Sequence, residues 1–212
     1  MPNLPISQLP TSDTLTGSEL FVTVQGGVTK QTTLNSLYTS LSSNYGLFNQ
    51  TGPSAPITNT TNELSLLDGG VGTLTVPANG FRKGDAFHAI LTGHISAANN
   101  NTLRIRIKSN STILADTGVI TLAGATNKDW ELEIYFSINE IGGLGVGSIS
   151  AGGTFNYTKD AGGALEGTIF STINNTTFNT TTSNTLEITA QWGAANLDNS
   201  IYSEIFTLNK TF

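Results

Sequence analysis

Strict alternation of apolar and polar residues is the feature of this sequence that most limits its fold. In residues 102–109, "TLRIRIKS", every second residue is apolar and the residues between them are mostly basic. Residues 129–138, "DWELEIYFSI", alternate in the same way. Successive side chains of a β-strand point to opposite faces, so this period predicts strands with one buried face. The apolar, inward set is Leu103, Ile105, Ile107, Trp130, Leu132, Ile134, Phe136 and Ile138.

Similar β-forming runs continue to the end of the chain. They are separated by turn-forming Gly, Asn and Asp, and no long helical pattern intervenes. About eight to ten strands fit into this region. We therefore expect an all-β fold with an antiparallel, jelly-roll-type β-sandwich over residues 64–212.

The composition argues against several classes of protein. The net charge is −6 with only 9 Lys and Arg, so we expect no nucleic-acid partner. The chain has no cysteine, which disfavours a disulfide-stapled secreted domain. It has no run of about 18 apolar residues, so we expect no membrane span. The opening "MPNLPISQLP" lacks the basic and apolar regions of a signal peptide.

The first 45 residues have the pattern of a small separate module. "ELFVTV" (residues 19–24) and "VTKQTT" (28–33) flank Gly26 and Gly27, which predicts a β-hairpin. "TTLNSLYTSL" (32–41) follows, with Thr33 as a helix cap and apolar residues at helical spacing. We expect a hairpin plus one short helix.

Such a module is too small to bury its apolar residues alone. We therefore expect residues 1–45 to attach the protein to a particle. Residues 46–63, with Pro53 and Pro56 among Ser, Thr and Asn, are expected to form a linker or neck in which Leu47 and Phe48 need partners from other chains. The candidate attachment residues are Leu20, Val22, Val24, Leu34, Leu37 and Leu41.

Nothing in the sequence indicates catalysis. His88 and His94 lie on one expected strand, about 20 Å apart at 3.3 Å per residue, so they cannot share a metal ion. No nucleophile elbow, phosphate loop or metalloprotease motif occurs. The acidic residues lie mostly in turn-like contexts. We expect no catalytic residue, no metal and no cofactor, and therefore no enzyme.

Two alternatives concern binding. The basic residues of 102–109 could form cross-strand pairs with Glu131 and Glu133 if their strands are neighbours, or they could form a basic stripe for a ligand. The polar stretches 96–102 and 174–184 could contact a sugar. They lack Trp and Tyr residues to stack on its rings.

Two segments resemble virion proteins of tailed bacteriophages. "ISQLPTSDTLTGSELFVTVQGGVTKQTTLNSL" (residues 6–37) is similar to the module that begins many phage fibre and appendage proteins. "NTLEITAQWGAANLDNSIYSEIFTLNKTF" (184–212) is similar to closing strands of jelly-roll domains in head fibres, capsid decoration proteins and tail fibres. The resemblance implies an N-terminal piece that attaches to the particle and a C-terminal domain that trimerises and faces solvent.

The resemblance implies a structural protein located in the virion. We expect a homotrimeric head fibre or capsid decoration protein that docks on a capsid or other virion protein through its N-terminal module. The alternative is a short tail fibre whose C-terminal domain binds a host surface receptor or glycan. The chain lacks the long repetitive shaft expected of a tail fibre, which favours the head.

Overall fold

The computed structural model describes residues 16, 18–34, 36–37 and 48–212. The chain divides into two compact units, Met1–Ser42 and Ser43–Phe212, and each is described by itself. Among the described residues, no helix is long and apolar enough to cross a membrane.

The first unit contains the expected hairpin. Strands β1 (Leu20–Gln25) and β2 (Val28–Thr33) pair antiparallel along their full length. Gly26 and Gly27 have φ angles of 61° and 75°, a conformation that glycine adopts without steric cost. Helical backbone begins after β2, and Thr33 Oγ1 accepts a hydrogen bond from the Ser36 N–H at 3.1 Å, as expected of a cap. The rest of the expected helix, through Leu41, lies outside the described residues.

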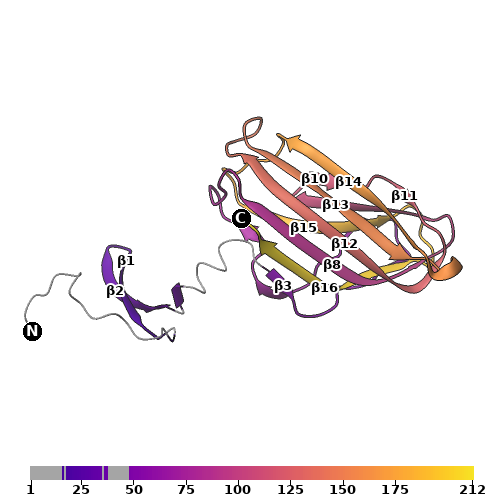
Figure 1. Cartoon of the computed structure of the whole chain (residues 1–212), viewed down its shortest axis with the longest axis horizontal. Helices are drawn as coiled ribbons and strands as arrows, with labels where there is room; N and C mark the ends of the chain where they lie inside the picture. The colour runs from indigo at the N-terminus through magenta and orange to yellow at the C-terminus, as the bar shows by residue number, and fades with distance from the viewer. Residues whose placement is uncertain (1–15, 17, 35, 38–47) are drawn as a thin grey trace, which may run out of the picture. The chain divides into compact units, whose positions relative to one another are not determined.

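The second unit is built from two antiparallel sheets (Figure 1). The larger sheet has eight strands. Its order is β14 (Leu165–Asn175), β13 (Ser148–Thr158), β12 (Ala125–Glu140), β8 (Ala86–Ala97), β16 (Ser200–Lys210), β3 (Phe48–Gln50) and β6 (Gly70–Gly72), and β4 (Ile57–Thr58) also pairs with β16.

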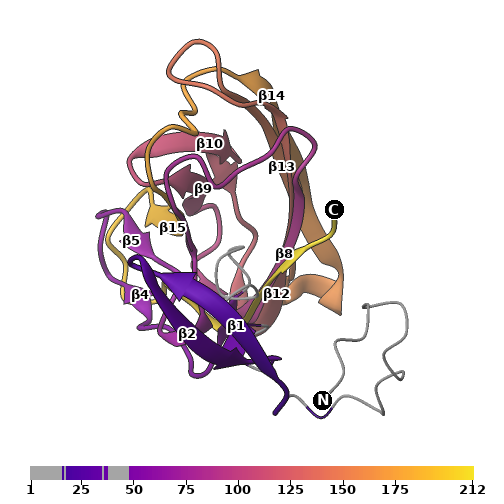
Figure 2. The ribbon, with the colours of Figure 1, turned by 90° about the vertical axis from the view of Figure 1, so that its left-hand side faces the viewer.

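The smaller sheet has six strands and lies against the larger one, as the side view in Figure 2 shows. A 3-10 turn, Ala161–Gly163, joins β13 to β14 in the larger sheet. The order of the smaller sheet is β10 (Thr112–Asp116), β9 (Thr102–Ser109), β15 (Asn184–Trp192) and β5 (Leu64–Ser65), with β11 (Ile120–Thr121) beside β9 and β7 (Thr75–Val76) beside β15.

One apolar core fills the space between the sheets. The alternating apolar residues of β9 and β12 are all buried in it, as the sequence pattern predicts. Trp130 and Trp192 are 2% and 1% exposed, which confirms that both belong to the core. The all-β, antiparallel class is confirmed. Because β12, β13 and β14 form a meander within one sheet, these pairings do not by themselves establish a jelly-roll strand order.

The expectation that residues 46–63 form a linker is wrong for residues 48–63, the part of this segment that the structure describes. Strands β3 and β4 both pair with β16, and Ile57 is 1% exposed. The indole N–H of Trp192 donates to the Ile57 carbonyl oxygen at 3.0 Å. Phe48 packs on Phe206 of its own chain, with ring centroids 5.8 Å apart, so it needs no partner chain. The turn-rich composition hid these strands because each has only two or three residues.

Candidate functional site

The hairpin exposes three of the six candidate attachment residues on one face. Leu20, Val22 and Val24 alternate along β1 and are 63%, 78% and 73% exposed. Their cross-strand partners, Thr33, Gln31 and Thr29, place polar groups beside them. The result is an apolar strip that no described residue covers.

The other three candidate attachment residues have different surroundings from the residues of this strip. Leu34 is partly buried, and its N–H donates to the Glu19 carbonyl oxygen at 2.9 Å, which extends the hairpin ladder. Leu37 is 39% exposed. Leu41 lies outside the described residues. The attachment role itself stays a prediction.

The basic side chains of β9 are neutralised by Asp116 of the neighbouring strand β10 and by Glu63, which directly precedes β5. The predicted pairs with Glu131 and Glu133 do not form, because β9 and β12 lie in different sheets. Arg104 Nε instead donates to Asp116 Oδ1 at 2.9 Å, and Arg106 Nη1 donates to Glu63 Oε2 at 2.6 Å. These partners leave no free basic stripe here for an anionic ligand.

Hydrogen bonds in this network lower the pKa of both carboxyl groups. Burial alone would raise the pKa of Asp116, but hydrogen bonds from Arg104 and Gly118 outweigh it. Burial likewise opposes ionisation of Glu63, and hydrogen bonds from Thr189 and Lys108 lower its pKa overall. The network therefore acts as a structural clamp between strands.

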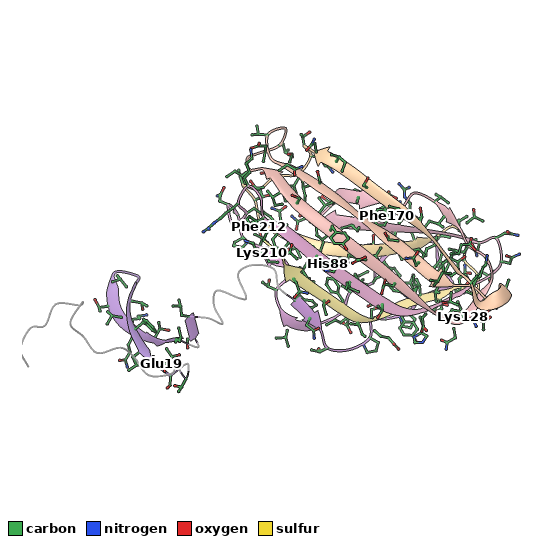
Figure 3. All side chains as sticks on the ribbon, in the orientation of Figure 1. Glu19, His88, Lys128, Phe170, Lys210 and Phe212 are labelled. Atoms are coloured by element: carbon green, nitrogen blue, oxygen red, sulfur yellow. The ribbon has the colours of Figure 1, made fainter. Side chains whose placement is uncertain are left out.

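The outer face of the larger sheet carries a compact group of His88, Glu133 and Tyr135. His88 Nε2 lies 2.9 Å from Glu133 Oε1, and the Tyr135 hydroxyl donates to the same oxygen at 2.5 Å. The two rings stack with centroids 4.8 Å apart. The Tyr135 hydrogen bond, followed by that of His88, lowers the pKa of Glu133, while the bond to Glu133 raises the pKa of Tyr135. Figure 3 shows His88 on its strand.

A second group surrounds His94 on the same face. His94 Nε2 lies 3.3 Å from Asp129 Oδ1, and its Nδ1 lies 3.4 Å from Glu204 Oε1. The second contact lacks hydrogen-bond geometry, so Nδ1 is a buried atom without a hydrogen-bond partner in the structure. The His94 ring also stacks on Tyr202, with centroids 5.8 Å apart. The two carboxylates approach opposite edges of the imidazole and do not converge on one point.

Neither group forms a metal centre. In residues 48–212 and the described part of the hairpin, no cluster of three or more His, Cys, Asp or Glu side chains could hold a metal ion. The two histidines lie in separate groups on β8, as their spacing predicts. The absence of catalysis stays a prediction.

Three hollows lie in a row on this outer face, with volumes of about 560, 290 and 380 Å³. The first and second share Thr154 and Ile169, and the second and third share Asn156 and Leu165. They therefore form one continuous groove over β13, which we call the β13 groove.

Sequence reasoning placed Glu131 and Glu133 correctly on an outer strand face but missed the groove. The sequence feature that could have revealed the groove is the row of small outward side chains on β13 beside the large outward side chains on β14. The outward residues of β13 are Ser150, Gly152, Thr154, Asn156 and Thr158, and the apolar ones of β14 are Leu165, Ile169 and Ile173.

Comparisons with known proteins give no sequence match and one weak structural match. No family model matches the chain, and no curated protein matches its sequence. One solved structure with a similar chain trace is the CBM2 module of the evolved Dit protein of Lactobacillus casei BL23 phage J-1. It is 12% identical, with 76% of each chain covered and a TM-score of 0.29.

Proposed function

We propose that this chain is a structural appendage protein of a tailed-phage virion. Its N-terminal unit attaches it to a capsid or other virion protein, and its sandwich faces solvent. In this proposal the protein is a trimeric head fibre or capsid decoration protein, and the sandwich is of jelly-roll type. It binds other molecules without cleaving them and uses no cofactor.

The contrast between the two units is the observation that carries this proposal. The sandwich buries a full apolar core of its own. The hairpin instead exposes Leu20, Val22 and Val24 along one face. An isolated two-stranded hairpin is marginal in water, so a strip of this kind needs a partner surface. A small dependent unit joined to a self-sufficient domain is the arrangement expected of an anchor and a displayed head.

A second candidate function is that of a short tail fibre that binds a host surface glycan. The β13 groove favours it, because a hollow of several hundred Å³ with both ring and polar side chains is the usual form of a small-ligand site.

A matched pair of substitutions tests the attachment role. Val22 and Val28 are both exposed but lie on opposite faces of the hairpin. We expect Val22→Asp to abolish incorporation into particles, measured by quantitative immunoblotting of purified virions, and Val28→Asp to reduce it much less. Deletion of residues 1–42 should also abolish incorporation while the sandwich stays folded. Particles that still carry the deleted protein would overturn the proposal.

A further inference from the structure

The β13 groove has walls and a floor of different chemistry. Its floor is the outer face of β13, from Ser150 to Thr158, where side chains are small or polar. One wall is the apolar row Leu165, Ile169 and Ile173 on the edge strand β14, which are 74%, 82% and 66% exposed. The other side is formed by outward residues of β12, and at the third hollow it extends across β12 to His94 of β8 and Glu204 of β16. From residue 150 to 158 the floor runs about 26 Å at 3.3 Å per residue.

The Tyr135 ring offers one open face to this groove. In the strand register, His88 lies on one side of Tyr135 and Gly152 on the other. His88 stacks on the first side and so fixes the ring. Gly152 has no side chain, and both it and Tyr135 line the largest hollow. A flat ligand can therefore lie over Gly152 against a ring whose orientation is already set, which reduces the entropy cost of binding.

Polar groups without partners lie along the same path. Glu133 uses only its Oε1 oxygen within the described part of the chain, where Oε2 receives no hydrogen bond. The side chains of Thr154 and Asn156 also make no hydrogen bond to any described residue, and both line the groove. These groups can accept from, or donate to, hydroxyl groups of a ligand.

The charge around the groove determines which ligands can bind there. Glu131 lines the third hollow, and Glu133 is the direct cross-strand partner of the floor residue Thr154, so both acids border the groove; the chain has a net charge of −6. Like charges would repel a phosphate polymer or an acidic polysaccharide. A neutral pyranose matches better, because its C–H face packs on aromatic and aliphatic side chains while its rim of hydroxyls reaches carboxylate, amide and hydroxyl groups.

We infer that the β13 groove binds a neutral polysaccharide, with one sugar ring stacked on Tyr135 and hydrogen-bonded to Glu133. The groove length accommodates several linked rings. This inference deepens the second candidate function and is independent of where the N-terminal unit attaches.

The test uses the full chain and isothermal titration calorimetry with hexasaccharides of glucose, galactose, rhamnose and N-acetylglucosamine. A hyaluronan hexasaccharide serves as the anionic probe. We expect at least one neutral probe to bind and hyaluronan to bind at least about tenfold more weakly, a difference of 1.4 kcal/mol. Tyr135→Ala should weaken binding about tenfold or more, and Glu133→Gln by several-fold.

Two further variants keep the test decisive. Thr154→Trp fills the groove floor and should abolish binding without removing a wall residue. Glu140→Gln, an exposed acid outside the groove that pairs with Lys83, should leave the dissociation constant unchanged. Circular dichroism checks that each variant is folded.

Three results would overturn the inference: no neutral probe binds, binding survives both Tyr135→Ala and Thr154→Trp, or sedimentation shows that Ile169→Asp dissociates an oligomer and that the groove is a subunit interface. The virion incorporation assay is a separate measurement. A protein that joins particles but binds no saccharide therefore refutes this inference alone.

Discussion

The imidazole ring of His88 is stacked on the phenol ring of Tyr135, with centroids 4.8 Å apart and planes inclined by 14°. The two residues are direct cross-strand partners on β8 and β12. Both also bond to the same oxygen of Glu133. Three side chains from two strands therefore hold one another in place on a surface that faces solvent.

The first prediction concerns the ionisation of Tyr135. The Glu133 carboxylate raises the pKa of Tyr135 because loss of the phenolic proton would break a hydrogen bond and place two negative charges together. We expect Glu133→Gln to lower this pKa toward its ordinary value near 10. Ultraviolet titration of tyrosinate measures it, with Tyr135→Phe identifying the signal. An unchanged titration would show that the hydrogen bond is not formed in solution.

A further prediction concerns how much His88 and His94 contribute to stability. Both are partly exposed on the sheet surface. His88→Ala and His94→Ala should therefore change the free energy of unfolding by about 1 kcal/mol or less each. Urea denaturation measures the effect, and a loss of several kcal/mol in either variant would contradict it.

The second prediction tests whether residues 48–63 belong to the sandwich. Ile57 is buried beside Trp192, whereas its neighbour Thr58 is exposed. Ile57→Ala should destabilise the sandwich by about 2–5 kcal/mol because it leaves a cavity. Thr58→Ala should change stability by about 0.5 kcal/mol or less. Equal effects in urea denaturation would restore the linker interpretation.

The third prediction concerns acid stability. The folded protein lowers the pKa of Asp116, so it holds fewer protons there than the unfolded chain does. The resulting stabilisation is present above the unfolded pKa, near 4, and is lost as the pH falls through the lower folded pKa. Asp116→Asn should cost about 1–3 kcal/mol at neutral pH, because Arg104 loses its partner.

The pH dependence separates this clamp from an ordinary surface pair. Asp116→Asn should destabilise less in acid, once the pH has fallen below the folded pKa of Asp116, than at pH 7, since the wild-type carboxyl group is then protonated too. Glu140→Gln, which removes an exposed partner of Lys83, should cost about 0–1 kcal/mol at neutral pH. Thermal unfolding at both pH values checks these expectations, and an Asp116→Asn effect that does not vary with pH would contradict them.

Local patterns predicted the long strands well, because the alternation that buries Leu103 and Trp130 is visible within each segment. The pairing of strands could not be predicted in the same way. Arg104 finds Asp116 rather than Glu131 because sheet membership depends on contacts between distant segments. The groove next to Tyr135 likewise requires Gly152, which is 17 positions away in sequence and a direct partner in the sheet. Sequence spacing alone does not encode that register.

The last prediction concerns oligomeric state. The proposed trimer would cover the apolar strip of the hairpin by a closed cyclic interface, the usual solution for a homo-oligomer. Val22 is the most exposed residue of that strip, at 78%. A buried aspartate without a partner is costly, so Val22→Asp should convert the trimer to monomer in analytical ultracentrifugation at micromolar concentration. Val28→Asp, the same change on the opposite face of the hairpin, should leave the trimer intact. If the unsubstituted protein sediments only as a monomer, the strip must be covered by the virion partner alone, and the trimer is wrong.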